Sequence, residues 1–236
     1  MASSIDDLAL GYAIMAQPDA KSRGSSLFPN PVIASSGPTG KKYLGICEQW
    51  IDRADPEVRK MFDAAVDHYV KEHSYEKVSI KIPFLPEGQK AHALTILSEV
   101  RSSVTPQQIS KLIYPNQLLL TVAGGHATGQ DFLFSQRLRD LQMRHLSWLW
   151  EKYPSMIIFT PTTPCAGWKI GNTKDIVQGG YGVSDGDMSL KSMEYVYFAN
   201  WTGTPAISCP MGYTDNGVPV GMMVSLYRTF LIYVCL

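Results

Sequence analysis

The stretch NWTGTPAISCPMGY, residues 200–213, places a helix end, a turn, a short strand and a proline break within a few residues. Gly203 can end a helix in the left-handed conformation, and Pro205 prevents the helix from continuing. The residues after Pro205 then enter a sheet, and an Asp-Asn-Gly turn leads into a second strand, PVGMMVSL (219–226). This end of the chain therefore predicts a helix followed by two strands.

The same kinds of element recur upstream of this stretch. Strands are expected at YLGIC (43–47), KVSIKIP (77–83) and SMIIFTPTTP (155–164). Helices are expected after a Ser4 cap, after Asp55 as N-cap with Pro56 next, and at 86–100, 105–113, 114–123, 129–151 and 189–203. The alternation of strand and helix over 43–100 is typical of crossover units with parallel pairing. The sequence therefore predicts the α/β class, with a mixed β-sheet flanked by helices.

The long helix predicted at 129–151 carries an apolar stripe. Phe134, Leu138, Leu141 and Trp148 follow one another along it, and His145 falls on the same stripe. We expect His145 to be a core histidine rather than a catalytic one, and the stripe to lose part of its cover if part of the fold is missing from this chain. On the same helix, Asp140 and Arg144 are four residues apart and are expected to form an ion pair.

Composition excludes several classes of protein. The chain has 236 residues, 45% hydrophobic and 18% charged, and a formal net charge of zero, so nucleic acid is not an expected partner. No apolar run approaches the roughly 20 residues of a membrane helix. The four cysteines lie outside metal-ligand spacing of one another, and the N-terminus lacks a basic leader. These features favour free thiols in a reducing compartment, and we expect a cytoplasmic protein.

Other stretches imitate catalytic motifs without completing them. GGHATGQD (124–131) has phosphate-loop glycines but Gln130 where a lysine is required. Ser74 and Lys77 fit Ser-x-x-Lys, yet the companion motifs are missing. The five histidines form no local metal-binding pattern, so no metal site is expected from them.

The stretch NWTGTPAISCPMGYTDNGVPVGMMV (200–224) resembles the C-terminal signature of the amidase signature family. That family includes fatty acid amide hydrolases and the amidase subunit of glutamyl-tRNA amidotransferase. ASSIDDLAL (2–10), VSIKIPFLPEGQKAHALTI (78–96) and SMIIFTPTTP (155–164) resemble other family segments in the same order. The resemblance covers position 1 to about 224. It implies hydrolysis of a small-molecule carboxamide through an acyl-enzyme, without a metal or organic cofactor.

The catalytic machinery that this resemblance implies is not found in the 236 residues. Family members use a serine nucleophile and a bridging serine on a Gly-Gly-Ser-Ser-Gly-type loop, with a lysine base before it. Both would precede the position matched by Met1, and GSS at 24–26 falls too late to replace them. We therefore expect no catalytic residue in this chain, an incomplete amidase-signature fold, and an upstream segment that encodes the loop. Residues 1–226 are expected to form the C-terminal part of the domain and 227–236 a divergent apolar tail.

The segment TPTTPCAGW (160–168) follows a predicted strand, where ligands of α/β sheets gather. We expect Thr162, Thr163 and Trp168 to line the substrate pocket; the alternative is that they are turn residues with a packed indole. The function expected from the sequence is that of a C-terminal amidase fragment that is inactive alone and poorly stable in isolation. A non-catalytic binding or interaction fragment remains the alternative, and the oligomeric state stays open.

Overall fold

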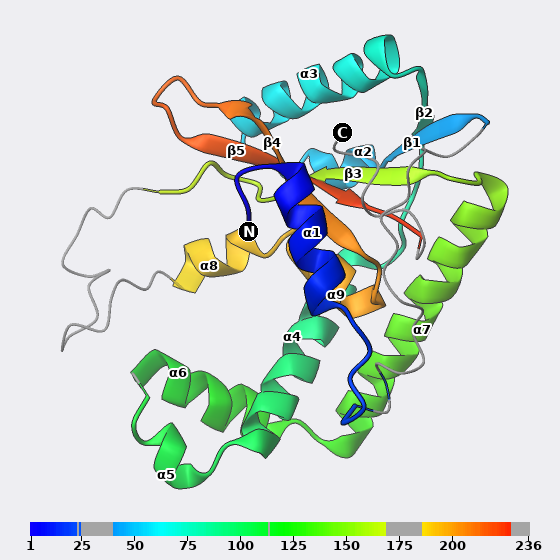
Figure 1. Cartoon of the computed structure of the whole chain (residues 1–236). Coiled ribbons are helices and arrows are strands. Elements are labelled where there is room, and N and C mark those ends of the chain that lie inside the picture. The colour runs from blue at the N-terminus through cyan, green and yellow to red at the C-terminus, as the bar shows by residue number, and fades with distance from the viewer. Residues whose placement is uncertain (23, 25–39, 113, 169–185, 228–236) are drawn as a thin grey trace.

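The computed structural model describes residues 1–22, 24, 40–112, 114–168 and 186–227 (Figure 1). Its described part contains one five-stranded sheet in the order β2-β1-β3-β5-β4. The first three strands in this order run parallel, whereas β5 is antiparallel to both β3 and β4. The mixed sheet expected from the sequence is thus confirmed. Its strands are β1 (Lys42–Ile46), β2 (Tyr75–Ser79), β3 (Ile157–Pro161), β4 (Ala206–Tyr213) and β5 (Pro219–Ser225).

Helices cover both faces of the sheet (Figure 1). Helix α3 (Pro56–Glu72) lies on one face, and α4 (Leu85–Ser103), α7 (Gly129–Lys152) and α9 (Val196–Thr202) lie on the other. The remaining helices are α1 (Ile5–Met15), α2 (Glu48–Ile51), α5 (Pro106–Ile109), α6 (Tyr114–Leu118), the π-helix η2 (Leu119–Gly124) and α8 (Gly186–Ser192).

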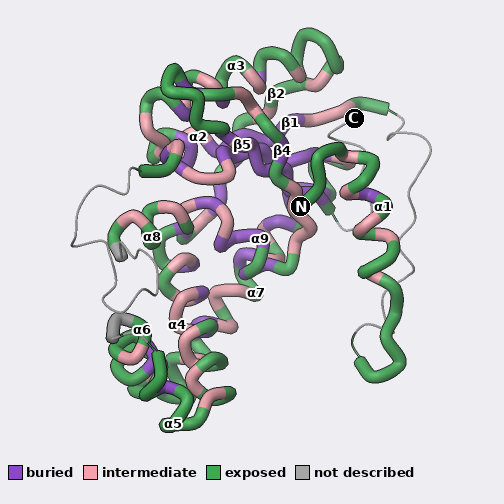
Figure 2. Tube along the Cα trace, turned by 60° about the vertical axis from the view of Figure 1, so that its left-hand side comes forward, coloured by how far each residue is buried: buried purple, intermediate pink, exposed green. Residues whose placement is uncertain are grey.

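Two apolar clusters hold these layers together. On the α3 face, Phe62 and Val66 pack against the strand residues Leu44, Phe159 and Val224, all of them buried. On the opposite face a larger, aromatic-rich cluster joins α7 and α9 to the sheet. Its members include Trp50, Leu146, Trp150, Ile158, Tyr197, Trp201 and Met223. Figure 2 shows that burial is concentrated at the sheet and at α9, whereas the α5–α6 end is mostly exposed.

Local sequence signals account for several element ends. Gly203 has φ of 70° and ends α9, and Gly217 has φ of 76° in the turn between β4 and β5. Asp55 is the N-cap of α3 with Pro56 after it, as expected. Its carboxylate does not cap the helix, however, because it binds Lys191 Nζ at 2.6 Å. The ion pair with Lys191 thus takes the place of a capping hydrogen bond from the Asp55 carboxylate to the first turn of α3.

The single helix expected at 189–203 is instead two helices, α8 and α9. Between them, the Glu194 carboxylate accepts bonds from Arg53 at 2.7 Å and from the Trp50 indole at 3.1 Å. The buried Tyr195 hydroxyl donates to the Trp50 carbonyl at 3.1 Å. These contacts with α2 fix the break in the helix.

The apolar stripe predicted on the long helix is largely exposed, and a different face of the helix is buried. Phe134, Leu141 and Trp148 are 52%, 43% and 51% exposed, and Leu138 is half-buried. The buried face is instead formed by Ser135, Gln142, Leu146, Leu149 and Trp150. His145 is half-buried at the margin, with Nε2 2.6 Å from the Lys81 carbonyl oxygen, rather than in the core. The Asp140–Arg144 ion pair is confirmed at 2.6 Å.

Gln142 links three elements through its buried amide. Its Nε2 donates to the carbonyls of Pro83 at 2.9 Å and Phe84 at 3.2 Å, and its Oε1 accepts from Trp201 Nε1 at 2.7 Å. Phe84 precedes α4 with φ of 58°, in the left-handed region that non-glycine residues rarely adopt. The amide therefore joins α7 and α9 to a strained turn at the start of α4.

Three further expectations can be compared with the structure. Cys47 and Cys165 are free and buried, in line with the expectation of free thiols. Across the described ranges, no helix combines the length and apolar character needed to cross a bilayer. The long Pro-, Gly- and Ser-rich stretch at 17–41 and the glycine-rich stretch at 165–186, both of which the sequence predicts as loops, lie mostly outside the described residues, as does all but the first residue of the tail at 227–236.

Candidate functional site

The carboxyl ends of the parallel strands β1 and β3 meet at one edge of the sheet. At this edge Thr162 follows β3, and its backbone N–H donates to the Gly221 carbonyl at 2.8 Å. The Thr162 hydroxyl lies 2.6 Å from the Ser208 hydroxyl of β4. The register of β3 and β4 on either side of β5 therefore brings two hydroxyls together at the sheet edge.

Gly221 makes room for this hydroxyl pair. A Cβ atom built on Gly221 would lie 2.8 Å from both Ser208 Oγ and Thr162 Oγ1, closer than real Cβ contacts allow. A side chain at position 221 would have to displace at least one hydroxyl. Sequence analysis did not identify Ser208 or Gly221 as part of this site.

The other two expected wall residues lie differently. The Thr163 hydroxyl donates to the Cys165 carbonyl at 2.8 Å, so it braces its own loop. That loop is also fixed to the start of α3, because the Asp55 N–H donates to the Pro164 carbonyl at 2.7 Å. Trp168 is 42% exposed and is not a packed indole. The structure thus pairs Thr162 with Ser208 and leaves Thr163 and Trp168 along the following loop.

The hydroxyl pair alone cannot act as an activated nucleophile. A serine or threonine hydroxyl becomes reactive when a nearby base takes its proton. In the described part of the chain, Thr162 and Ser208 bond each other, and neither has a histidine, lysine or carboxylate within hydrogen-bond distance. Within the same residues, no group of three or more His, Cys, Asp or Glu side chains could hold a metal ion. The pair can offer hydrogen bonds to a ligand.

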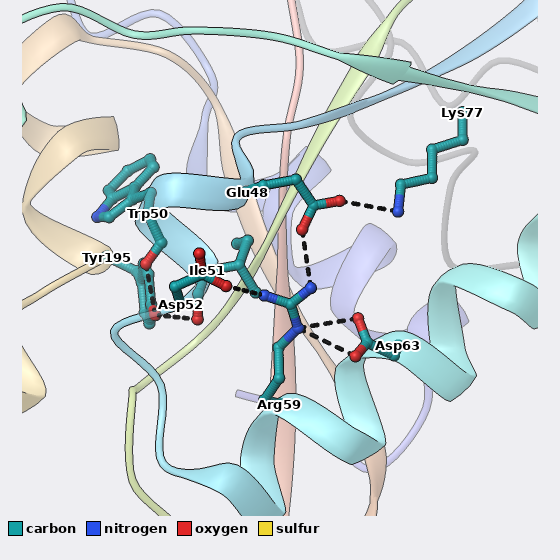
Figure 3. Close-up of polar contacts among 8 residues, drawn as sticks. All are labelled: Glu48, Trp50, Ile51, Asp52, Arg59, Asp63, Lys77 and Tyr195. Atoms are coloured by element: carbon teal, nitrogen blue, oxygen red, sulfur yellow. Dashed lines mark hydrogen bonds and ion pairs between the residues drawn. The ribbon is translucent and has the colours of Figure 1, made fainter.

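A second polar cluster surrounds Arg59 on α3 (Figure 3). Its guanidinium contacts Asp52 at 2.6 Å, Glu48 at 2.8 Å and Asp63 at 3.0 Å. Lys77 of β2 binds the other oxygen of Glu48 at 2.9 Å. Each carboxylate in this cluster has a cationic partner, so the cluster ties α2, α3 and β2 together and offers no unpaired acid or base.

The cluster predicts an acid-dependent loss of stability. The hydrogen bond from Lys77 is the main cause that lowers the pKa of Glu48. A carboxyl group with a lowered folded-state pKa stabilises the fold above its unfolded pKa, and this contribution disappears as pH falls through the folded-state value. Because both partners are partly exposed, we expect an effect of at most about 1 kcal/mol. Urea unfolding of Glu48→Gln from pH 6 to pH 3 should therefore show a weaker pH dependence than the parent.

The matched control for Glu48→Gln is Asp67→Asn. Asp67 and Lys71 are both 70% exposed and 3.6 Å apart, so this substitution should leave the pH dependence unchanged. Equal pH profiles for Glu48→Gln and the parent would show that the Lys77 bond contributes nothing to stability.

A pocket of about 230 Å³ lies away from the sheet edge, between α7, the end of α9 and the residues after β5. Trp150, Tyr227, Met143 and Leu146 form its apolar walls, and Ser147 and Thr204 contribute hydroxyls. None of the described residues that line it carries a charged side chain, so these residues provide no group suited to acid–base chemistry.

The comparisons with known proteins agree with the fold and the sequence motifs. The sequence model of the family named Amidase matches residues 1–225. A fatty acid amide hydrolase of Medicago truncatula is 30% identical over 243 aligned positions, covering 95% of this chain and 38% of the relative. The chain thus spans about two fifths of the length of that curated relative.

Two solved structures share the fold. A chain of an inhibitor-bound vestigial protein complex, described as revealing the evolutionary origins of an s-triazine catabolic enzyme, matches with a TM-score of 0.75 and 21% identity, over 99% of this chain and 50% of its own. A bacterial aryl acylamidase of the amidase signature family matches with a TM-score of 0.63 and 17% identity, over 85% of this chain and 43% of its own. Together with the family match over nearly the whole sequence, these likenesses show that the chain belongs to the amidase family, the amidase signature enzymes.

Proposed function

We propose that these residues form the C-terminal part of an amidase that hydrolyses carboxamides through a seryl acyl-enzyme. In that reaction a serine oxygen attacks the amide carbonyl, the amine leaves, and water hydrolyses the ester. The nucleophile and its lysine base would come from a segment outside the 236 residues. The observation that carries the proposal is the Thr162–Ser208 hydroxyl pair at the carboxyl edge of β1 and β3 in a family member.

In this proposal the sheet edge is a wall of the substrate pocket. Thr162 and Ser208 present hydroxyls that can bond an amide, and the exposed ring of Trp168, further along the loop after β3, offers an apolar surface. The Thr163 hydroxyl holds the loop that leads from Thr162 to Trp168. Such a site, apolar with a few placed polar groups, is the usual form of a small-molecule pocket.

The proposal also covers the extent of the domain, the cofactors of the reaction and its location in the cell. Residues 1–226 would belong to one amidase domain, and the chemistry would need neither a metal nor an organic cofactor. We also propose a cytoplasmic location. The support for it is that the buried cysteines Cys47 and Cys165 are free, as is usual in a reducing compartment.

A hybrid protein tests the proposal. It joins the part of the Medicago truncatula relative that precedes the matched region to residues 1–236, and it is assayed with a fatty acid amide. We expect hydrolysis and stoichiometric labelling by a fluorophosphonate. Thr162→Val in the hybrid should lower kcat/KM about 5–10-fold, mainly through KM, because one hydrogen bond to substrate is lost. Thr162→Ser keeps the hydroxyl and should restore most of the activity.

The same hybrid distinguishes the alternative function. The lack of an activated nucleophile among the described residues is also compatible with a non-catalytic binding or interaction fragment. A hybrid that unfolds in one sharp thermal transition, yet neither hydrolyses amides nor reacts with the fluorophosphonate, would support that alternative and overturn the amidase proposal.

A further inference from the structure

A small cavity lies inside the core, among β3, β5, α7 and α9. Its volume is about 10 Å³, close to the space that one water molecule needs. Three residues with hydroxyl groups line it, namely Thr160 of β3, Ser225 of β5 and Thr204 between α9 and β4. The rest of the described wall is apolar and buried, and consists of Trp50, Leu146, Trp150, Ile158, Phe198 and Met223. The cavity therefore belongs to the core of this chain rather than to a face that another part of the domain would cover.

The hydroxyl of Thr160 has no hydrogen-bond partner within the part of the chain that the structure describes. Thr160 is only 2% exposed, so its hydroxyl cannot bond the bulk solvent instead. A buried hydroxyl without a partner destabilises the fold, and native proteins nearly always supply one from the protein or from an ordered water. Valine has almost the same shape as threonine and would avoid this cost. The hydroxyl at position 160 therefore points to a bound partner.

The hydroxyl protons near the cavity indicate what kind of partner fits. The Thr202 hydroxyl donates its one proton to the Phe198 carbonyl at 2.7 Å. In its contact with the Thr204 hydroxyl, at 3.1 Å, Thr202 must therefore accept, and Thr204 donates. Thr204 then has only an acceptor left for the cavity, whereas Thr160 can both donate and accept. The partner must itself donate and accept hydrogen bonds, and water is the molecule of this size that does both.

We infer that one water molecule is bound in this cavity by the hydroxyls of Thr160, Ser225 and Thr204. Buried waters typically form about three hydrogen bonds with polar groups that lack other partners. Here the water donates to Thr204 and accepts from Thr160, and Ser225 provides the third bond. The water thereby links β3, β5 and the connection between α9 and β4. The inference is independent of the proposed amidase activity.

The surroundings of the cavity agree with water as the occupant. None of the described residues that line it carries a carboxylate, an imidazole or a thiol, so they offer no common metal ligand. Leu146, Trp150 and Thr204 also line the pocket of about 230 Å³, so water can reach the cavity from that side. Cavities with wholly apolar walls stay dry, whereas this one has three hydroxyl-bearing residues.

The sign of the stability change in Thr160→Val tests the inference. Valine keeps the shape of the side chain and removes the hydroxyl, so the water loses a partner or leaves the cavity. We expect the folding equilibrium constant of the full chain to fall about 5- to 30-fold in urea unfolding. Without a bound water, the substitution would remove an unpaired hydroxyl and the constant would rise. An unchanged or raised constant would overturn the inference.

Combining this change with Ser225→Ala tests whether the two hydroxyls share one partner. They form no direct hydrogen bond, so a common water is what couples them. The double variant should be more stable than the sum of the two single effects predicts, by at least about twofold in the folding equilibrium constant. The control pairs Thr160→Val with Thr95→Val, a buried threonine of α4 outside the cavity, and should be additive. Additive losses for Thr160 and Ser225 would contradict a shared water.

A crystal structure of the full chain that resolves ordered waters gives the direct readout. We expect one water at about 2.7–3.0 Å from Thr160 Oγ1. A cavity without electron density for water, or a Thr160 hydroxyl bonded to a protein group, would show that the inference is wrong. Where the 236 residues alone do not unfold cooperatively, the same variants are compared in the hybrid protein. Its unfolding is then the measurement, so the result does not depend on whether it hydrolyses amides.

Discussion

The 236 residues produced alone are expected to release amine from an amide no faster than buffer does. A serine hydroxyl needs a base to take its proton, and the oxyanion needs donors worth about 3–4 kcal/mol each in the transition state. The described hydroxyls at the sheet edge have no base, and the Ser-Ser-Lys segment implied by the family resemblance is not in this sequence. Enzymes accelerate such reactions by at least about 10⁶-fold. We therefore expect the hybrid to release amine at a readily measured rate and the 236 residues alone to release none above the buffer.

The measurement pairs product release with mass spectrometry after fluorophosphonate treatment. The hybrid is the positive control and should be labelled at one serine of its upstream half. Stoichiometric labelling of the 236 residues alone, at Ser208 or at Ser25 or Ser26, would contradict the expectation and identify a nucleophile within this chain.

Gln142→Leu is expected to cause the largest loss of stability from a single substitution. Leucine fills a similar volume but leaves the Trp201 indole N–H and the Pro83 carbonyl without their partner in a buried site. It also releases the left-handed Phe84 turn that the amide holds. Buried unpaired polar groups cost about 1–3 kcal/mol each, so we expect a loss of about 3–5 kcal/mol. Native domains are stable by only about 5–15 kcal/mol.

Chemical and thermal unfolding measure this loss. Gln136→Leu is the matched control on the same helix: Gln136 makes one bond from its Nε2, to Thr95 at 3.1 Å, and is only partly buried, so it should cost about 1 kcal/mol. Trp201→Phe combined with Gln142→Leu should cost less than the sum of the two single changes, because the pair shares one bond. Fully additive losses would show that the indole bond does not contribute to the effect of Gln142.

Sequence alone was sufficient where a local signal decides the structure. Gly203 and Pro205 fix the end of α9 by backbone conformation, and Pro56 fixes the start of α3. The strand that leads to Thr162 was recognisable as an apolar run bounded by prolines. These features depend on residues close together in the chain, so they can be predicted without knowledge of the tertiary structure.

Features that depend on distant partners could not be predicted. Helix α7 carries large apolar residues on two faces. The face with Gln142 is the buried one, because carbonyl groups at the start of α4 and the Trp201 indole of α9 form hydrogen bonds with the Gln142 amide. Ser208 joins Thr162 only through the register of β4 on β5, and an isolated serine in a strand gives no sign of it. For Gly221, the only feature in the sequence that could have indicated a role in the site is that glycine has no side chain.

During synthesis on the ribosome, the order of the strands in the sheet determines how long each strand waits for its neighbours. Strand β1 is complete at Ile46, but β3, its central neighbour, begins only at Ile157. At about 5–20 residues per second, β1 waits roughly 5–20 s for this partner to be translated. Helices α3, α4 and α7 and strand β2 are made during that interval, and α3 can cover Leu44 with Phe62 and Val66, whereas the other edge of β1 stays unpaired until β3 emerges. A nascent chain therefore carries one unpaired edge of β1 until β3 is made, and chaperones that bind such edges have their longest opportunity there.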